Sequence, residues 1–454
     1  MAEFEKILEI INKAIWSNKL VIVLLALGIL YTFANGFIQV RKFGFIMKKT
    51  LIQSFKERNK EREEGSLSTF KAMMMTLAGN IGGGNVVGVA TAVVAGGMGS
   101  IFWMWVAAFF GMALKYGEIV LSQLYRERDK KSGQILSGPM YYIRDGLKLP
   151  WLGVVIAFLM TIKMMGANLV QSNTIANILK DNFSIDPKIT GVVLVVLLFA
   201  LTTGGLKRVA NVATRLVPSM SIIYVVLCLI VLVLNFNHIP YVFEQIFSQA
   251  FSFKAAAGGA GGLIIARAMQ FGIARGMYSN EAGEGTAPFA HGTAIVDHPV
   301  EEGITGVTEV FIDTIVICTM TALTIGVSGI NLDGSIQASN MAISAIGMVY
   351  KPLSFLAIFA LLIFCFTTLM GQWFNAAKSF TYCYGQKVTE VVKYIFPFLC
   401  MIGCLGKINV VWTVQDIAMG LVVIPNLIAL IILFPKVREQ TKDYFENFLK
   451  KDVK

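Results

Sequence analysis

The chain has 454 residues, of which 56% are hydrophobic and 15% are charged. An average soluble domain carries roughly 25% charged residues, so this composition excludes a soluble multidomain enzyme, and the high hydrophobicity excludes intrinsic disorder. A net charge of +11 fits either a nucleic-acid binder or a membrane protein with basic cytoplasmic loops; the positions of the charges decide between them.

Eleven apolar runs follow one another along the chain, most of them long enough to form a membrane span of ~20 residues. The runs are 16–38, 70–96, 98–125, 150–180, 188–204, 213–235, 258–280, 303–328, 352–380, 388–405 and 410–434. Basic residues collect in alternate connections, at 41–62, 126–148 and 207–215, and again in the tail. This alternation predicts a multi-pass protein of the cell membrane with the N-terminus outside and the C-terminus cytoplasmic. It also explains the positive charge without a nucleic-acid partner.

The second apolar run is interrupted at its centre. Residues 78–85 read Ala-Gly-Asn-Ile-Gly-Gly-Gly-Asn, and such a stretch holds a regular helix poorly. Because freed backbone groups in hydrocarbon must be satisfied by protein, ion or water, an unwound stretch here predicts a polar cavity. The alternative is close helix packing through small residues. A dinucleotide-binding loop is excluded because no strand precedes the glycines.

The seventh run carries a similar sequence at 270–276, which continues through 280–285. We expect a second break there. Each break opens a set of five runs, and broken helices at corresponding positions of two halves are typical of transporters built from inverted repeats. The predicted fold is therefore an all-α polytopic membrane domain spanning 1–454, with an accessory helix at 16–38, a first repeat at 70–235, an inverted repeat at 258–434 and a cytoplasmic tail at 435–454.

The exposed backbone groups of two broken helices suit a zwitterionic amino acid, since free amides attract a carboxylate and free carbonyls attract an ammonium group or a metal cation. In the first break the amides of residues 83–85 suit the carboxylate, and in the second the carbonyls around Phe271 suit the ammonium group. Bulky neighbours would limit the side chain to a small one, although each of them also fits ordinary helix packing. The predicted substrate-binding residues are Asn80, Gly83, Gly84, Asn85, Gln171, Phe271, Gly272, Ile273, Met277 and Trp373.

Oxygen atoms for a cation are available near the first break. The carbonyls of Gly79 and Ile81 would be free there, and the adjacent hydroxyls of Thr367 and Thr368 can add oxygen ligands for Na⁺. The alternative for the threonines is a hydrogen bond to their own helix.

Ionisable residues inside apolar runs are functional by default. Lys163 and Asp313 lie near the middle of their runs and are expected to pair, whereas Lys115 and Glu118 are three residues apart and predict a pair on one helix face. The candidates for coupling or gating are Lys163, Arg275, Glu281 and Asp313.

Catalytic chemistry is not predicted. The six cysteines and three histidines form no nucleophile or metal-ligand pattern, so we expect neither an enzyme nor a resident cofactor. The remaining function classes are a transporter, a channel and a non-transporting receptor. The oligomeric state stays open.

Two long segments carry a family resemblance. Residues 96–106 (GGMGSIFWMWV) and 276–288 (GMYSNEAGEGTAP), together with His291, resemble the signatures of the alanine/glycine–cation symporter family, and the similarity extends over essentially the whole chain. The resemblance implies the five-plus-five inverted repeat of the amino acid–polyamine–organocation superfamily. It also implies Na⁺-coupled uptake of alanine or glycine by alternating access, with proton coupling as the alternative.

The resemblance further implies roles for particular residues. Thr367 and Thr368 match the position that supplies hydroxyls to the superfamily's common sodium site, which the carbonyls of Gly79 and Ile81 would complete. A second sodium site with Asn85 as a ligand stays open.

Overall fold

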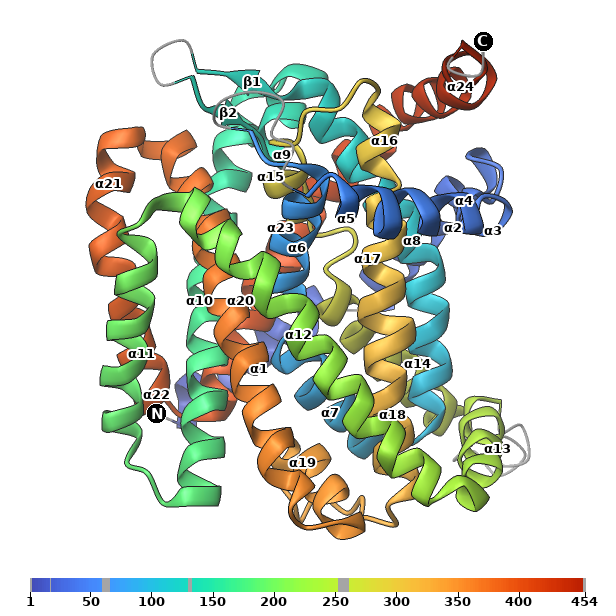
Figure 1. Ribbon diagram of the computed structural model, residues 1–454, viewed down its shortest axis with the longest axis vertical. Helices are drawn as coiled ribbons and strands as arrows, with labels where there is room; N and C mark the ends of the chain where they lie inside the picture. The colour runs from blue at the N-terminus through green and yellow to red at the C-terminus, as the bar shows by residue number, and fades with distance from the viewer. Residues whose placement is uncertain (1, 17, 59–65, 130–132, 252–260, 452–454) are drawn as a thin grey trace.

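The computed structural model describes residues 2–16, 18–58, 66–129, 133–251 and 261–451. Almost every described element is helical, as the apolar runs predict (Figure 1). The α-helices are α1 (Ala2–Ile15), α2 (Asn18–Ala34), α3 (Ile38–Arg41), α4 (Phe43–Met47), α5 (Ser54–Lys56), α6 (Thr69–Asn80), α7 (Val89–Gly96), α8 (Gly99–Tyr125), α9 (Pro139–Tyr141), α10 (Pro150–Phe183), α11 (Pro187–Thr202), α12 (Gly205–Leu234), α13 (Ile239–Ala250), α14 (Gly261–Asn280), α15 (Ala287–His291), α16 (Pro299–Gly303), α17 (Thr305–Val310), α18 (Thr319–Val327), α19 (Ala338–Val349), α20 (Leu353–Tyr384), α21 (Gln386–Ile395), α22 (Leu399–Leu405), α23 (Ile408–Asp443) and α24 (Leu449–Lys451).

Short π- and 3₁₀-helical segments join or continue these helices. The π-helical segments are η1 (Lys48–Gln53), η2 (Gly84–Gly88), η3 (Tyr142–Gly146), η6 (Phe311–Cys318) and η8 (Tyr444–Phe448), and the 3₁₀ segments are η4 (Phe236–His238) and η7 (Phe396–Phe398). One antiparallel hairpin pairs β1 (Glu127–Arg128) with β2 (Ile135–Leu136).

Within the described residues, seven helices are long and apolar enough to cross a membrane, and a bent pair, α6 with η2–α7, makes an eighth. The described residues of the eleven predicted runs are mostly helical, and residues 17 and 258–260 of two runs lie outside the described residues. Of these helices, α2 and α11 belong to the shorter apolar ones and α14 is not among the seven. The protein is thus a multi-pass membrane protein, while the count of eleven and the inverted repeat stay predictions. The predicted boundary at residue 434 lies inside α23, which continues to Asp443.

The helices are arranged around two buried pairs. α14 packs along α8, and α10 packs along α20 (Figure 1). On the periphery, α11 and α12 turn large apolar side chains outward, among them Val196, Ile222 and Val233. An apolar outer surface of this kind is expected to face lipid, because exposing so much apolar area to water is unfavourable. The polar residues described below lie inside this apolar ring.

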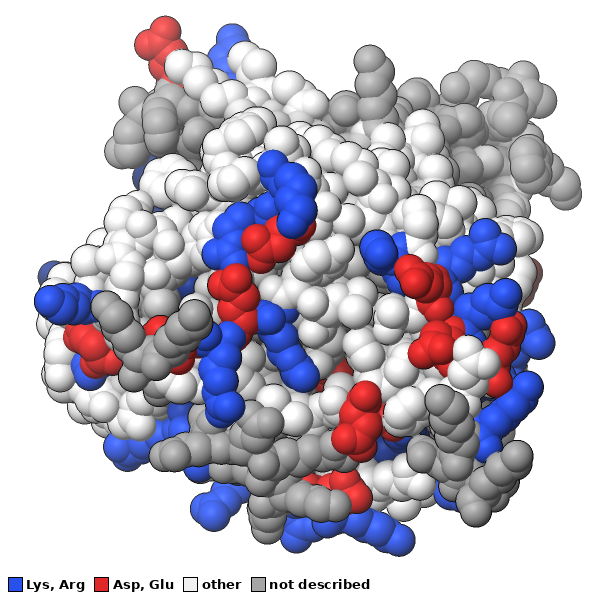
Figure 2. All heavy atoms as spheres, turned by 90° about the horizontal axis from the view of Figure 1, so that it is seen from above, with Lys and Arg blue, Asp and Glu red and all other residues white. Residues whose placement is uncertain are grey.

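The two ends of the molecule differ. One end carries β1–β2 and α16 and is called the hairpin end, whereas the other carries α13 and α19 and is called the α19 end (Figure 1). Figure 2 views the hairpin end and shows Lys and Arg side chains gathered over it. The described parts of the basic connections 41–62, 126–148 and 207–215 therefore give this end its positive charge.

Candidate substrate and ion site

The predicted interruption of the first broken helix is present. α6 ends at Asn80, and the axis turns by 51° before the chain continues as Gly84–Gly96. Ile81 has an extended ψ of 98°. The side chain of Asn85 stabilises the turn locally, because its Oδ1 accepts a hydrogen bond from the amide of Gly82 at 2.9 Å.

One side of this break faces α10. The amide of Gly83 donates to Oε1 of Gln171 at 3.1 Å, and both residues are buried. Gln171 is thus a neighbour of the break, as its depth in the fourth run predicts. The amide of Gly83, which would suit a carboxylate, thus donates to the neutral side-chain oxygen of Gln171.

The other side of the break faces α20. Thr368 Oγ1 lies 3.3 Å from the carbonyl oxygen of Ile81, and Gln372 Nε2 lies 3.5 Å from that of Gly79. The hydroxyls of Thr367 and Thr368 also lie 2.9 and 3.0 Å from the carbonyl oxygen of Phe364 in their own helix, which is the alternative given above for the threonines. Gln372 is not among the residues predicted from sequence. Its position four residues after Thr368 places it on the same helix face, and this spacing could have identified it.

The predicted break at 270–276 is wrong, because α14 is helical without interruption from Gly261 to Asn280. Its glycines serve packing instead. A Cβ on Gly272 would lie 2.2 Å from the carbonyl oxygen of Ser100 on α8, and one on Gly276 would lie 3.0 Å from Cγ of Met104. Small residues let two membrane helices approach closely, so the carbonyls around Phe271 stay within the helix and are not free.

The later part of the same predicted segment, 280–285, is where the interruption falls, because residues 281–286 between α14 and α15 are not helical. Gly283 and Gly285 have φ values of 86° and 77°, and Glu281 has a φ of 54°. The glycines supply this left-handed backbone without steric cost, whereas Glu281 adopts it as a non-glycine residue, which is uncommon.

The last turn of α14, rather than its middle, reaches the first break. Asn80 Nδ2 donates to the carbonyl of Asn280 at 3.3 Å. A Cβ on Gly84 would lie 3.1 Å from the ring of Tyr278 and 3.5 Å from Cα of Ser279. Residues 278–280 therefore hold the position that the sequence assigns to residues 271–273.

The other predicted substrate residues have contacts of their own. Phe271 packs its Cβ against Gly96 at the end of α7, and Ile273 and Met277 are buried. Trp373 follows Gln372 on α20 and packs against the ring of Phe396, with the ring centroids 5.1 Å apart. Trp373 is thus the neighbour in sequence of Gln372, whose side chain contacts the break.

Asp313, on η6, is surrounded by neutral donors. Asn85 Nδ2 lies 2.7 Å from Oδ1 of Asp313, Thr314 Oγ1 donates to Oδ2 at 2.8 Å, and Ser279 donates to the same oxygen. The predicted pair of Asp313 with Lys163 is wrong, because Lys163 binds other carboxylates. Burial depth along a run does not fix which face of the helix a residue occupies, and here the two residues face different neighbours.

Lys163 instead stabilises the interruption after α14. Its Nζ lies 2.6 Å from Oε1 of Glu281 and 2.9 Å from Oε2 of Glu284. All three side chains are buried. This ion triad holds a backbone that local sequence alone leaves flexible.

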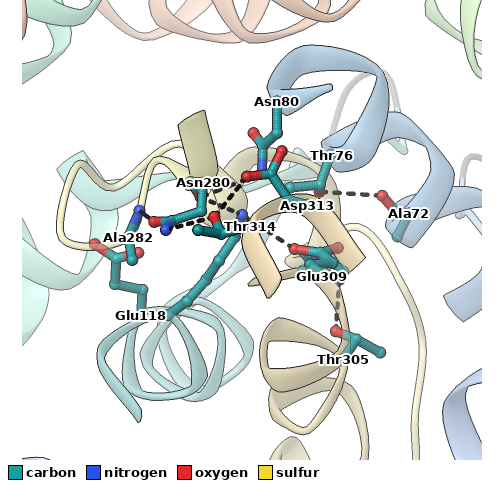
Figure 3. Close-up of polar contacts among 12 residues, drawn as sticks. Ala72, Thr76, Asn80, Glu118, Asn280, Ala282, Thr305, Glu309, Asp313 and Thr314 are labelled. Atoms are coloured by element: carbon teal, nitrogen blue, oxygen red, sulfur yellow. Dashed lines mark hydrogen bonds and ion pairs between the residues drawn. The ribbon is translucent and has the colours of Figure 1, made fainter. Parts of the chain in front are cut away.

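Lys115 and Glu118 do not pair with each other. Lys115 donates to the carbonyl of Asn280 at 2.9 Å and lies 3.3 Å from Oε2 of Glu309. Glu118 accepts from Asn426 at 2.6 Å and from the amide of residue 285 at 2.9 Å. Figure 3 shows that Asn280 is the meeting point of this network, with Thr314, Glu309 and Asp313 around it.

Arg275 forms the one charged pair described between α14 and α23. Its two terminal nitrogens lie 3.3 and 3.2 Å from the two carboxylate oxygens of Asp416. The guanidinium also lies over the rings of Tyr278 and Trp412, 5.8 and 5.6 Å from their centroids. Asp416 is not among the residues predicted from sequence, and the pair lies on the α19 side of the first break.

A multi-pass helical protein with a broken helix at a buried polar centre belongs, by architecture, to the class of membrane transporters. The sequence comparison is specific: the chain belongs to the sodium:alanine symporter family, whose model matches residues 1–454. It is therefore related to transporters and not to an enzyme class.

Two relatives and one solved structure illustrate the similarity. The chain is 36% identical over 454 residues to "Sodium/alanine symporter AgcS" of Methanococcus maripaludis, covering 98% of each chain. It is 36% identical over 452 residues to "Probable sodium/glutamine symporter GlnT" of Bacillus subtilis, covering 97% of this chain and 90% of the relative. A solved Na⁺-coupled sialic acid symporter matches with a TM-score of 0.44 at 13% identity, covering 86% of this chain and 82% of that chain.

Proposed function

We propose that this chain is a sodium-coupled symporter that imports small neutral amino acids, such as alanine and glycine, by alternating access. The observation that carries the proposal is the first break, where a backbone amide and two backbone carbonyls meet only neutral side chains. Family membership and the names of the relatives support amino acids and Na⁺ as the cargo.

The substrate lies in the turn between α6 and η2. The amides of Gly83, Gly84 and Asn85 hold its carboxylate, and the side chain of Gln171 moves from Gly83 to the bound amino acid. The carboxyl end of α14 takes the ammonium group, because the last carbonyls of a helix carry partial negative charge. Crowding by Tyr278 limits the substrate to a small side chain.

The coupling ion lies on the α20 side. The carbonyls of Gly79 and Ile81 and the hydroxyl of Thr368 are oxygen ligands of the kind that Na⁺ accepts. Thr367 contributes only if its hydroxyl turns away from its own helix.

Proton coupling is the second candidate. The observation in its favour is the buried carboxylate of Asp313, whose described hydrogen-bond partners Asn85, Ser279 and Thr314 are all neutral. An uncompensated buried carboxylate favours a proton or a cation. A channel is less well supported, because the buried break is closed by direct hydrogen bonds on both sides.

The orientation follows from the loops. Basic connections at the hairpin end support a cytoplasmic position for that end and for the C-terminus, with the N-terminus outside. Arg275 and Asp416 then form the gate toward the outside. The triad of Lys163, Glu281 and Glu284 belongs to the part that must move when the cytoplasmic side opens.

Reconstituted vesicles test this function. We expect [¹⁴C]alanine to accumulate against its gradient when Na⁺ is high outside, and to be displaced by glycine more strongly than by leucine. Accumulation that ignores Na⁺ and follows a pH gradient would assign the coupling to protons. Alanine flux with channel-like conductance, or no flux under either gradient, would overturn the proposal.

A further inference from the structure

A cavity of about 300 Å³ opens at the hairpin end, away from the first break. It lies among β2, the end of α20, α21, the start of α12 and the segment before α6, and its lining includes Ser137, Trp373, Lys378, Thr389, Glu390 and Lys393. A volume of this size is at the lower end for small-molecule sites. It is large enough for a small amino acid.

Lys378 brings an unbalanced charge into this cavity. Its Nζ donates to the carbonyl of Ile135 at 3.1 Å and lies 3.3 Å from Oγ of Ser137. An ammonium group has three donors, and among the described residues no carboxylate lies within ion-pair distance of this one. By contrast, Lys393 in the same lining pairs with Glu390. In the part of the chain that the structure describes, the contacts of this amino group are thus two neutral oxygens and the ring of Phe374, 5.5 Å from its centroid, and not a carboxylate.

Consecutive residues of α20 contact the cavity and the first break. Trp373 is part of the cavity lining and is almost fully buried, and its indole Nε1 has no hydrogen-bond partner among the residues that the structure describes. The preceding residue, Gln372, contacts the carbonyl of Gly79 in the break. From Trp373 to Lys378 is five residues, or ~7.5 Å along a helix. A molecule that leaves the break toward the hairpin end thus meets an unpaired indole donor and then an unpaired ammonium group.

We propose that this cavity is a release site for the carboxylate of the transported amino acid, with Lys378 as its anion-binding residue and Trp373 as a hydrogen-bond donor in its lining. This inference rests on the proposed function and names a second binding station on the same route. The occupant is a carboxylate small enough for 300 Å³, and it pairs with Lys378, since Glu390, a carboxylate of the same lining, is already paired with Lys393. A weak site of this kind gives the substrate a binding position between the neutral break and the cytoplasm, which speeds its release.

Face-resolved kinetics test the release site. Initial [¹⁴C]alanine fluxes are measured in inside-out and right-side-out membrane vesicles from cells that express the full chain. In Lys378→Met we expect the KM at the cytoplasmic face to rise about tenfold, the order expected for losing one hydrogen bond to a charged group. The KM at the external face stays within about twofold. Lys378→Arg retains the cytoplasmic KM, and the matched control Lys393→Met, which removes an already paired charge from the same lining, leaves both unchanged.

Competition identifies the ligand chemistry. Propionate on the cytoplasmic face inhibits the unmodified chain, propanamide does not, and Lys378→Met loses the inhibition. The same fluxes are repeated in phosphatidylcholine vesicles with and without phosphatidylglycerol. An effect of Lys378→Met that disappears without phosphatidylglycerol would assign the cavity to a lipid phosphate and overturn the carboxylate.

The remaining outcomes separate this inference from the function on which it rests. If the unmodified chain moves alanine but Lys378→Met changes both faces equally, neither face, or only the external face, the release site is wrong and the symporter stands. If the unmodified chain moves no neutral amino acid at either face, the proposed function fails and the release site fails with it.

Discussion

The two glycine-rich segments of this chain look alike in sequence and behave differently in the fold. At residues 78–85 the helix breaks, whereas at 270–276 it continues and uses its glycines to approach α8. The surroundings differ as well: neutral side chains such as Gln171 and Thr368 satisfy the first break, whereas ion pairs satisfy the interruption at 281–286. A high glycine content thus indicates where a membrane helix is able to break, and the contacts with neighbouring helices determine whether it breaks there.

The largest effect is expected at the charged interruption. Replacing Lys163 by Met leaves Glu281 and Glu284 buried without a cation, which costs ~3–5 kcal/mol for a buried pair that loses one partner. Thermal unfolding in detergent should show a large loss of stability, and the folded yield should fall. A variant that also carries Glu281→Gln and Glu284→Gln should recover most of the loss, because no buried charge then lacks a partner. Unchanged stability of Lys163→Met would show that the triad does not hold the interruption.

A smaller loss of stability is expected where α14 packs on α8. A Cβ on Gly272 meets a backbone carbonyl at 2.2 Å, which cannot rotate away, so Gly272→Ala should cost ~1–3 kcal/mol as an overpacked contact. Gly276→Ala is the graded control, because a Cβ there meets the flexible side chain of Met104 at 3.0 Å. In both variants, the protein that folds should have an unchanged KM for alanine. If Gly272→Ala is stable but fails to bind substrate, the segment at 270–276 belongs to the site after all.

The third prediction concerns the neutral break, where transport should suffer more than stability. A Cβ on Gly82 would lie 2.2 Å from Oγ1 of Thr368, a side-chain atom that is able to rotate. Gly82→Ala should therefore displace that hydroxyl from the carbonyl of Ile81 and reduce Na⁺-dependent uptake about tenfold, which corresponds to ~1.4 kcal/mol. Gly44→Ala on α4 is the control, since it lies outside the break and nothing lies within 4 Å of its added Cβ. Equal uptake by the two variants would remove Thr368 from the ion site.

The sequence predicted the helical, multi-pass character of the chain and the first break because both depend on local composition. Asn85 caps the amide of Gly82 three residues earlier, so the turn is largely encoded by its own residues. The sequence predicted the second interruption over both 270–276 and 280–285, and it could not show that the first of these stays helical, because that depends on contacts such as that of Gly272 with α8. Partners such as Asp416 for Arg275 were missed for the same reason: depth along a run says nothing about which face a neighbouring helix presents.

The smallest effect is a pH dependence confined to the charged region. His291 on α15 lies in the connection between α14 and α16, with Nδ1 2.7 Å from Glu302 and Nε2 2.6 Å from Glu309. Burial alone would lower the pKa of His291, but the two carboxylates raise it from 6.5 to about 9.

Since this folded-state pKa lies above the ordinary value, the contribution of the imidazolium to stability should be complete below pH 6.5 and should be lost as the pH rises through about 9. We expect the melting temperature in detergent to fall by a few degrees across this window in the unmodified chain, and the fall to be smaller in His291→Gln. Lys115 faces Glu309 from α8, with its Nζ 3.3 Å from Oε2 of that carboxylate. The same slope in both proteins would mean that the proton is held elsewhere, and the neutral break, which contains no histidine, should contribute none of it.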